Sequence, residues 1–293
     1  GSNPVNKYSN SDVSVVVCTM NSISGIQECL ASLREVGVGE IIVVDANSTD
    51  GTQEIASKLA DKLLVDPGTG LGNARNIGIK ESTGNLILNM GSDNVMPEHQ
   101  LEKMVHYLEQ GGFHGVAAKT QVIGESFCAQ GLNSWRAGRF PEGERAIIGT
   151  PTLFLGDTLR EHPYDPSRRF SDDSELCERW TKKFNAKFAI SDAVVLEVGK
   201  TSWNEVQIRA KMYGVSDQEV FMKNRGTWSL ARKTKSLLHP LTVDFIMPVQ
   251  HLSFSQALRS IPFLAAFTSL RYASWLTTEI KLRQRNSLVD KSN

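Results

Sequence analysis

The chain has 293 residues, of which 40% are hydrophobic and 22% charged, enough apolar material for one large core or two fused lobes. Its 32 basic and 32 acidic residues give a formal net charge of zero, so charge supplies no argument for a nucleic-acid partner, and we expect none. No apolar stretch reaches the roughly 18 residues of a membrane-spanning helix, and four scattered cysteines without metal-binding spacing indicate reduced thiols and a cytoplasmic protein.

Residues 1–10 are polar, and we expect a tag remnant and disorder there. The following residues alternate apolar β-branched runs with helical spacing of apolar side chains. Strands are predicted at 13–18, 40–45, 63–65, 86–89 and 115–123, and helices at 24–36, 52–63, 72–81 and 97–110, with Pro97 in the first turn of the last. Because such alternation implies right-handed crossovers, we predict an α/β fold with a mostly parallel central sheet flanked by helices.

Small, polar and acidic residues follow three of the predicted strands. These ends read Thr19-Met20-Asn21, Asp45-Ala46-Asn47-Ser48-Thr49-Asp50 and Gly91-Ser92-Asp93. Ligands of parallel sheets bind beyond the carboxyl ends of the strands. Any single end of this kind also suits a loop or a helix cap, whereas three together favour one shared ligand crevice.

Three blocks resemble the nucleotide-binding half of family 2 glycosyltransferases, which have the Rossmann-like GT-A fold. They are VVVCTMN, IIVVDANSTDGT and GNARNIGIKESTGNLILNMGSD, in order over about 80 residues, and DANSTDGT is the most specific. The resemblance implies an inverting hexosyltransferase that uses a nucleotide-diphosphate sugar, UDP- or GDP-linked. The acceptor would be a hydroxyl of a glycan or of a lipid-linked molecule in polysaccharide or glycoconjugate biosynthesis.

The resemblance also implies which residues bind the nucleotide. Asp45 is expected to contact the base, while Ser48 and Asp50 equally suit a turn and helix start. Arg75 is expected to pair with a phosphate, or else to be a solvated arginine on a helix face. The full set is Thr19, Asn21, Asp45, Ser48, Asp50, Gly72, Arg75 and Ser92.

A divalent cation, Mg²⁺ or Mn²⁺, is expected to bridge the diphosphate, because such ions use one or two protein carboxylates together with phosphate oxygens. The family commonly has Asp-x-Asp where this chain reads Gly91-Ser92-Asp93, so its first acid is missing. Asp93 takes the last position and is the expected principal ligand. Glu197 is a candidate second ligand, or else an ordinary strand carboxylate.

The block SDDSELCERW, residues 171–180, resembles the segment that supplies the family's catalytic base. This similarity places Asp173 as the general base and Asp172 as the acid before it, capping the helix together with Glu175. Alternatively, both aspartates only complement the helix dipole. A carboxylate at a helix start should stay ionised at neutral pH, which makes it available but a weak base. One base opposite the leaving group implies inversion at the anomeric carbon.

Four segments are predicted: the tag remnant, a nucleotide-sugar subdomain at 11–123, an acceptor and catalytic-base subdomain at 124–236, and C-terminal amphipathic helices at 237–293. Trp135 either stacks on a sugar or belongs to the core. Residues 253–285 mix apolar and basic side chains, which suits a helix on a membrane surface, a homodimer interface or packing on the catalytic domain. Membrane contact would make the protein peripheral on the cytoplasmic face.

Two other functions remain open at this point. The missing first acid also suits a metal-independent, non-catalytic nucleotide-sugar-binding protein. A nucleotidyltransferase would require a Gly-rich phosphate loop with a basic residue after the first strand, and residues 19–25 lack one.

Overall fold

The structure is a computed structural model that describes residues 5–167 and 172–292. The chain divides into two compact units. The sheet unit comprises residues 1–121 and 141–198, and the helical unit comprises residues 122–140 and 199–293. The helical unit therefore draws on both of the segments predicted as 124–236 and 237–293.

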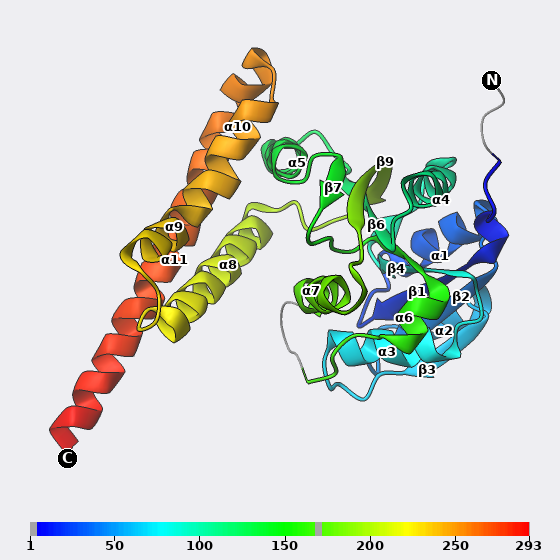
Figure 1. Cartoon of the computed structure of the whole chain (residues 1–293), viewed down its shortest axis with the longest axis horizontal. Coiled ribbons are helices and arrows are strands. Elements are labelled where there is room, and N and C mark those ends of the chain that lie inside the picture. Colours follow the sequence, from blue (N-terminus) through cyan, green and yellow to red (C-terminus); the bar gives the residue numbers. More distant parts are fainter. Residues whose placement is uncertain (1–4, 168–171, 293) are drawn as a thin grey trace. The chain divides into compact units, whose positions relative to one another are not determined.

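The sheet unit contains the strands of the molecule. They are β1 (Val13–Thr19), β2 (Glu40–Asp45), β3 (Lys62–Val65), β4 (Leu86–Gly91), β5 (Asn94–Val95), β6 (Gly115–Val122), β7 (Gly143–Arg145), β8 (Thr152–Leu155) and β9 (Phe188–Glu197). Within the described residues they form one nine-stranded sheet in the order β3-β2-β1-β4-β8-β6-β9-β5, with β7 paired to β9 (Figure 1).

The sheet is parallel only from β3 to β4. Beyond β4, β8 pairs with β4, β6 with β8, and β5 and β7 with β9, all antiparallel. The predicted α/β fold is confirmed, and its mixed half has a simple cause. The alternation of strand and helix ends at β4. The next strand that pairs with β4 is β8, which follows only after β5, β6 and β7 in the chain, so no single crossover helix sets its direction.

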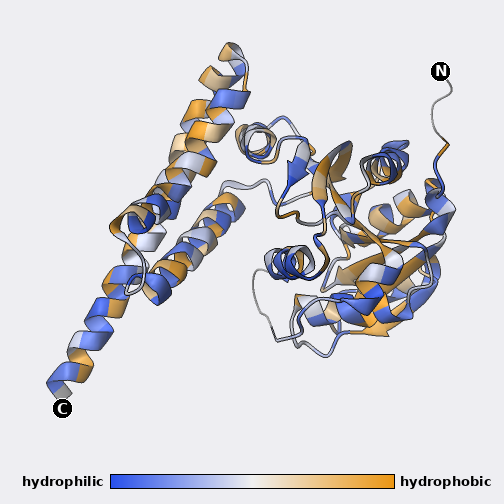
Figure 2. Cartoon of the chain, viewed as in Figure 1, coloured by the Kyte–Doolittle hydropathy of each residue, from blue (hydrophilic) through white to orange (hydrophobic). Residues whose placement is uncertain are grey.

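Helices cover both faces of the sheet. They are α1 (Ile26–Glu35), α2 (Thr52–Leu59), α3 (Leu71–Glu81), α4 (Gln100–Gly111), α6 (Gly156–Glu161) and α7 (Asp172–Phe184), preceded by the short η1 (Asn10–Asp12). Alternate strand residues face opposite layers, so Val15 and Val17 pack with α1, α2 and α4, and Val16 packs with α3, α6 and α7. The hydrophobic colour of the central strands in Figure 2 follows from burial on both faces.

Two details of the N-terminal half differ from the sequence expectations. Within the segment expected to be disordered, the Tyr8 amide donates to Glu109 Oε1 at 3.1 Å, and Tyr8 packs on the core. Residues 1–4 of that segment lie outside the described residues. The helix expected from Pro97 begins instead at Gln100, because His99 adopts a left-handed φ of 68° as its cap.

The helical unit is built around the C-terminal helices. Its elements are α5 (Phe127–Arg139), α8 (Trp203–Asn224), α9 (Leu230–Leu241), the π-helical η2 (Thr242–Ile246), α10 (Met247–His251) and α11 (Phe254–Ser292). Trp135 is 1% exposed and packs with Phe263 and Phe267, so it is a core residue and not a sugar-stacking platform. Among the described residues, no helix combines the length and hydropathy needed to cross a membrane.

A buried ion cluster ties the helices of this unit together. Asp244 of η2 is fully buried and accepts hydrogen bonds from Trp135 Nε1 at 2.8 Å and Arg271 Nη1 at 2.9 Å. Arg271 also donates through two nitrogens to Asp217 at 2.6 and 2.9 Å. Because a buried charge is costly unless it is paired, these contacts fix α5, α8, η2 and α11 in one arrangement.

Candidate active site

Four hydrogen bonds tie together the loops that follow β1 and β2. The Asn21 amide donates to Ser48 Oγ at 2.9 Å, and Asn21 Oδ1 accepts from the Thr49 amide at 2.9 Å. The Ile23 amide donates to Asp50 Oδ2 at 3.1 Å, and the Ser22 amide donates to Thr52 Oγ1 at 2.9 Å. The carboxyl ends of these neighbouring strands therefore form one connected rim.

Several predicted nucleotide-binding side chains serve this rim. Asp50 Oδ1 accepts from the hydroxyl of Thr52, the first residue of α2, at 2.6 Å, which matches the turn-and-helix-start alternative for Asp50. Ser92 belongs to the loop after β4, and its Oγ lies 2.8 Å from Ser22 Oγ. The structure thus brings Asn21, Ser48, Asp50 and Ser92 together, and their nucleotide contacts stay predictions.

Asp45 at the end of β2 is 2% exposed, and four donors of the same chain surround it. They are Thr19 Oγ1 at 2.7 Å, Ser48 Oγ at 2.5 Å, the Ser48 amide at 2.9 Å and Gln53 Nε2 at 2.8 Å. Burial acts to raise the pKa of Asp45, but these donors outweigh it and hold the pKa below its usual value. A carboxylate offers about four acceptor positions, and four donors already use those of Asp45, so a nucleotide contact would have to displace one donor. Of the donor residues Thr19, Ser48 and Gln53, Gln53 has the longest side chain.

The loop after β4 carries Asp93 where the sequence places the metal ligand. A Cβ added at Gly91 would lie 2.9 Å from Asp93 Oδ1 and 2.9 Å from Asn94 Oδ1. The side chains of Asp93 and Asn94 therefore occupy the space in which a side chain at position 91 would begin. Beneath the loop, the free thiol of Cys29 lies 3.6 Å from the Gly91 carbonyl oxygen. Burial, followed by the charge of Asp93, raises the pKa of Cys29 to about 12, so this thiol stays protonated.

Glu197 reaches the same loop from the end of β9. It is directly opposite Asn94 in the antiparallel pair of β5 and β9, and the Val198 amide donates to the Asp93 carbonyl oxygen at 2.9 Å. Among the described residues no group of three or more His, Cys, Asp and Glu side chains could hold a metal. Asp93 and Glu197 adjoin through the backbone, and an ion with these two carboxylates would have to take its other ligands from a diphosphate and water.

Asp172 and Asp173 begin α7 against the N-terminal turn of α3. The carboxylate of Asp172 lies 3.2 Å from the position of a Cβ at Gly72, so Gly72 allows this close approach. Asp172 lies within the first turn of α7, and residue 171 before it is outside the described residues. Glu175, which the sequence suggests as part of a helix cap, pairs with Arg179 four residues on at 2.9 Å.

Asp173 has two differently placed oxygens. Its Oδ1 accepts a hydrogen bond from the Tyr164 hydroxyl at 3.3 Å and lies 3.6 Å from Arg75 Nη1. Its Oδ2 faces Gly149, where an added Cβ would lie 3.7 Å away. With 28% of the Asp173 side chain exposed, Oδ2 is the oxygen left for an incoming molecule.

The ionisation of Asp173 differs from the sequence expectation. A carboxylate at a helix start is expected to have a low pKa, but burial raises the pKa of Asp173 above its usual value, although Arg75 and Tyr164 act to lower it. Asp173 is therefore a stronger base than its helix position alone implies.

Sequence reasoning missed the residues that hold this base. Tyr164 is buried, and its hydroxyl accepts from Asn89 Nδ2 at 3.1 Å, which directs the hydroxyl hydrogen towards Asp173. Asn76 of α3 holds the Tyr164 backbone through two hydrogen bonds of 2.7 and 3.0 Å. Arg75 is not a solvated arginine, since its Nη2 donates to Thr150 Oγ1 at 2.8 Å and its guanidinium lies over the Tyr164 ring. The one signal in the sequence was Asn89, an amide at the end of an apolar run.

Comparison with known proteins places this geometry in context. The model of the family "Glycosyl transferase family 2" matches residues 14–160. The succinoglycan biosynthesis protein ExoO of Rhizobium meliloti is 29% identical over 148 residues, which are 48% of this chain and 40% of ExoO. The matched region thus spans well under two thirds of that relative's length.

Two solved structures share the fold. A mannosyltransferase of Pyrobaculum calidifontis, in complex with GDP-Man and Mn²⁺, matches with a TM-score of 0.56 and 20% identity over 94% of this chain and 81% of that one. Residues 1–349 of TarS from S. aureus, in complex with UDP, match with a TM-score of 0.52 and 18% identity over 93% and 91%. At these identities the likeness establishes the fold alone.

Proposed function

Because the chain belongs to glycosyl transferase family 2 and is a glycosyltransferase, we propose that it transfers a sugar with inversion from a nucleotide-diphosphate sugar to an acceptor hydroxyl. UDP- and GDP-sugars are the proposed donors, since structures of the same fold contain UDP and GDP-Man. The proposed acceptor is a glycan or lipid-linked molecule in polysaccharide biosynthesis, the process named for ExoO.

The observation that carries this proposal is the asymmetric carboxylate of Asp173. Tyr164 and Arg75 engage Oδ1, whereas Oδ2 faces the side-chain-free space beside Gly149. The acceptor hydroxyl would donate its hydrogen to Oδ2 there. As its oxygen forms the bond to the anomeric carbon, the bond from that carbon to the phosphate oxygen breaks, the electron pair leaves with the nucleoside diphosphate, and Oδ2 takes the proton.

The donor would lie on the connected rim of the β1, β2 and β4 loops. Thr19, Asn21, Asp45, Ser48, Asp50, Gly72, Arg75 and Ser92 remain the proposed nucleotide-binding residues. Asp93 and Glu197 would hold a Mg²⁺ or Mn²⁺ ion, whose charge stabilises the leaving diphosphate when it is bound. Asp172, the other carboxylate proposed for the catalytic step, lies beside Gly72.

A thermal-shift and transfer assay tests the donor side. UDP and GDP are added with and without Mn²⁺, and the wild type is compared with Asp93→Ala and with the exposed control Asp192→Ala. We expect the nucleotide to raise the melting temperature more with Mn²⁺, and Asp93→Ala to lose that increment and to lower metal-dependent turnover about 100-fold or more. The control should keep both.

One alternative keeps support from a specific observation. Gly91 leaves the metal loop with a single acid, which suits a non-catalytic, metal-independent nucleotide-sugar-binding protein. Equal nucleotide affinity with and without Mn²⁺, together with no turnover of any donor, would favour that function over transfer.

A further inference from the structure

The net charge of zero is the sum of opposite formal charges on the two units. The helical unit contains 16 Lys and Arg against 7 Asp and Glu, a formal +9, and the sheet unit contains 16 against 25, a formal −9. Residues 220–243 of the helical unit hold five Lys and Arg and no acid. Such local asymmetry indicates an anionic partner for the helical unit.

Helix α9 lies in this basic stretch and exposes an apolar stripe. Leu230, Leu237, Leu238 and Leu241 recur at helical spacing on one side of the helix, and all four are exposed, Leu230 by 81% and Leu238 by 48%. The basic residues of α9 lie beside and behind that stripe and are Arg232, Lys233 and Lys235. Leucines on one face with lysines and arginines around them are typical of a helix that lies in a membrane interface.

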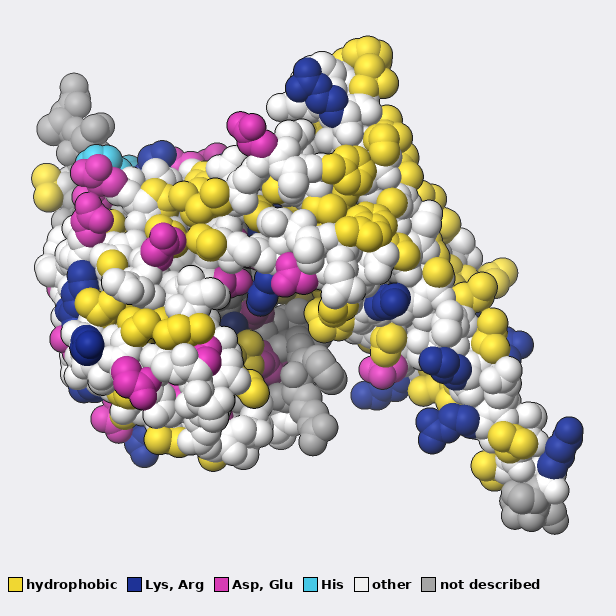
Figure 3. Space-filling model, turned by 180° about the vertical axis from the view of Figure 1, so that it is seen from behind, with side chains coloured by type: hydrophobic (Ala, Val, Ile, Leu, Met, Phe, Trp, Pro, Cys, Tyr) yellow, Lys and Arg dark blue, Asp and Glu magenta, His cyan; other side chains and the backbone are white. Residues whose placement is uncertain are grey.

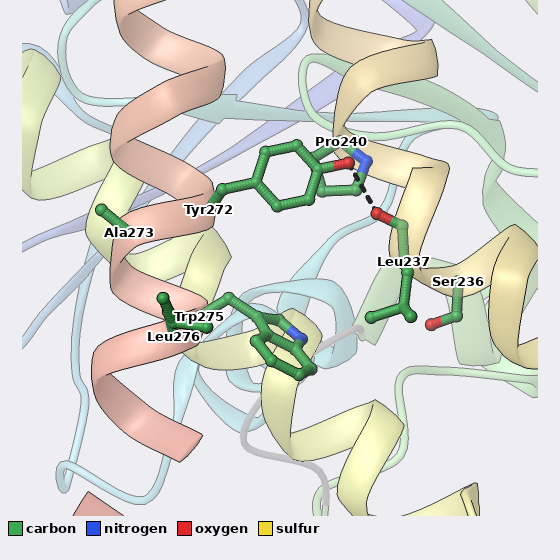
Figure 4. Close-up of a pocket in the computed structure, with 7 residues that line it drawn as sticks. All are labelled: Ser236, Leu237, Pro240, Tyr272, Ala273, Trp275 and Leu276. Carbon is green, nitrogen blue, oxygen red and sulfur yellow. Dashed lines mark hydrogen bonds between the residues drawn. The ribbon is translucent and has the colours of Figure 1, made fainter. Parts of the chain in front are cut away.

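The stripe continues onto α11 through an apolar hollow. A cavity of about 330 Å³ opens between the two helices, lined by Ser236, Leu237, Pro240, Tyr272, Ala273, Trp275 and Leu276 (Figure 4). Beyond it, Leu276 and Ile280 are exposed one turn apart. Yellow and dark-blue side chains run along the helical unit in Figure 3, with few acidic ones.

The Tyr272 hydroxyl of α11 hydrogen-bonds the backbone of α9 at this hollow. Pro240 has no N–H and interrupts the hydrogen-bond ladder of α9. The Tyr272 hydroxyl enters the gap: it accepts from the Leu241 amide at 3.3 Å and donates to the Leu237 carbonyl oxygen at 2.6 Å. The stripe on α9 is therefore fixed to α11 rather than loosely attached.

The predicted segment 253–285 is largely occupied within its own unit. Phe263, Leu264 and Phe267 are fully buried against α5 and α8, so they are not available to a membrane or a second copy. The exposed apolar side chains of α9, with Leu276 and Ile280, form the surface that remains, and we call them the leucine surface.

We propose that the helical unit binds an anionic membrane surface through the leucine surface. A lipid interface satisfies both of its properties, because acyl chains accept the leucines while anionic headgroups attract the surrounding Lys and Arg. A hydrophilic polyanion would leave the leucines in water. A second copy would bring two formally +9 units together, which charge repulsion opposes.

Vesicle sedimentation of the full chain tests this proposal without any need for transferase activity. Vesicles of phosphatidylcholine alone are compared with vesicles of phosphatidylcholine and phosphatidylglycerol. We expect binding to the anionic vesicles only, weakened by salt. The triple change Arg232→Ser, Lys233→Ser and Lys235→Ser should weaken it about 100-fold, and Leu230→Ser with Leu238→Ser about 10-fold or more.

The matched control removes three lysines from the sheet unit, Lys58→Ser, Lys80→Ser and Lys103→Ser, all exposed. It should bind as the wild type does, and circular dichroism should show every variant folded. The proposal fails if the wild type ignores anionic vesicles or if the control loses as much binding as the α9 triple variant.

Two further outcomes would assign the surface to another partner. Polyphosphate binding that the leucine changes leave unaltered, with no vesicle binding, would indicate a polyanion site. A dimer in light scattering that the leucine changes dissociate would indicate a second copy. Because donor binding is measured separately, failure here leaves the glycosyltransferase proposal standing.

Discussion

The surroundings of two carboxylates in the sheet unit shift their pKa values in opposite directions. Asp45 lies among four donors that lower its pKa, so its charge stabilises the loops around it. Asp173 is held by one hydroxyl and one guanidinium, and burial raises its pKa. The first carboxylate is a structural anchor. The second is kept at a cost to the folded state, which is the usual condition of a group retained for chemistry.

The sharpest test of this comparison is Asp173→Asn. The change removes the proposed base and should lower kcat about 100- to 10,000-fold. It should also raise stability at neutral pH. A carboxyl whose pKa is raised by folding favours the folded state below its unfolded pKa, about 3.9, and loses that contribution as the pH rises through the folded value.

Urea unfolding at neutral and acidic pH measures the second effect. An increase of about 1 kcal/mol, or roughly 2–4 °C in Tm, is expected near neutrality, shrinking as the pH falls below the folded-state pKa. Full transfer activity in this variant would refute the assignment of the base, and an equal gain at both pH values would refute the ionisation argument.

Asp45→Asn should have the opposite effect on stability. An amide nitrogen facing donors that expect an oxygen should destabilise the fold by about 2–4 kcal/mol at neutral pH. Since folding lowers the pKa of Asp45, its contribution is present above the unfolded pKa and is lost as the pH falls through the folded value. The free energy of unfolding, compared with that of the exposed Asp192→Asn, gives the answer; two equal values would remove Asp45 as an anchor.

Tyr164→Phe should produce the smallest and most specific change. It leaves the charge of Asp173 in place but removes the hydroxyl that lowers its pKa, so that pKa should rise further. The acidic limb of the kcat profile should move to higher pH, with about a 10-fold loss in kcat and little change in KM for the donor. Tyr8→Phe, outside the site, serves as the control; an unshifted profile would make Tyr164 a packing residue only.

Local patterns predicted the fold and the polar ends of three strands because these depend on short runs of sequence. The β-branched runs of β1 and β2 and the polar ends at Thr19, Asp45 and Asp93 are of this kind. The contacts between loops were not predictable in this way. Asn89 and Tyr164 are 75 residues apart in the sequence, and no periodicity connects them.

The two compact units differ from the segments predicted from the sequence for the same reason. Residues 122–140, which include α5, belong to the helical unit, whereas the chain on both sides of them belongs to the sheet unit. Their apolar spacing predicts a helix but cannot say which core receives it. Only the contacts of Trp135 with Phe267 and Asp244, more than 100 residues later, decide this.

The partition of charge has a consequence for the order of events at the site. A nucleotide-diphosphate sugar is itself an anion, and the unit whose loops would receive it has a formal charge of −9. Close to that unit, its charge would oppose the approach of the proposed donor, most strongly at low ionic strength. A donor already neutralised by a divalent ion would approach without this penalty. The acidic unit would thus favour the metal-bound form of the proposed donor before any side chain of the proposed site makes contact.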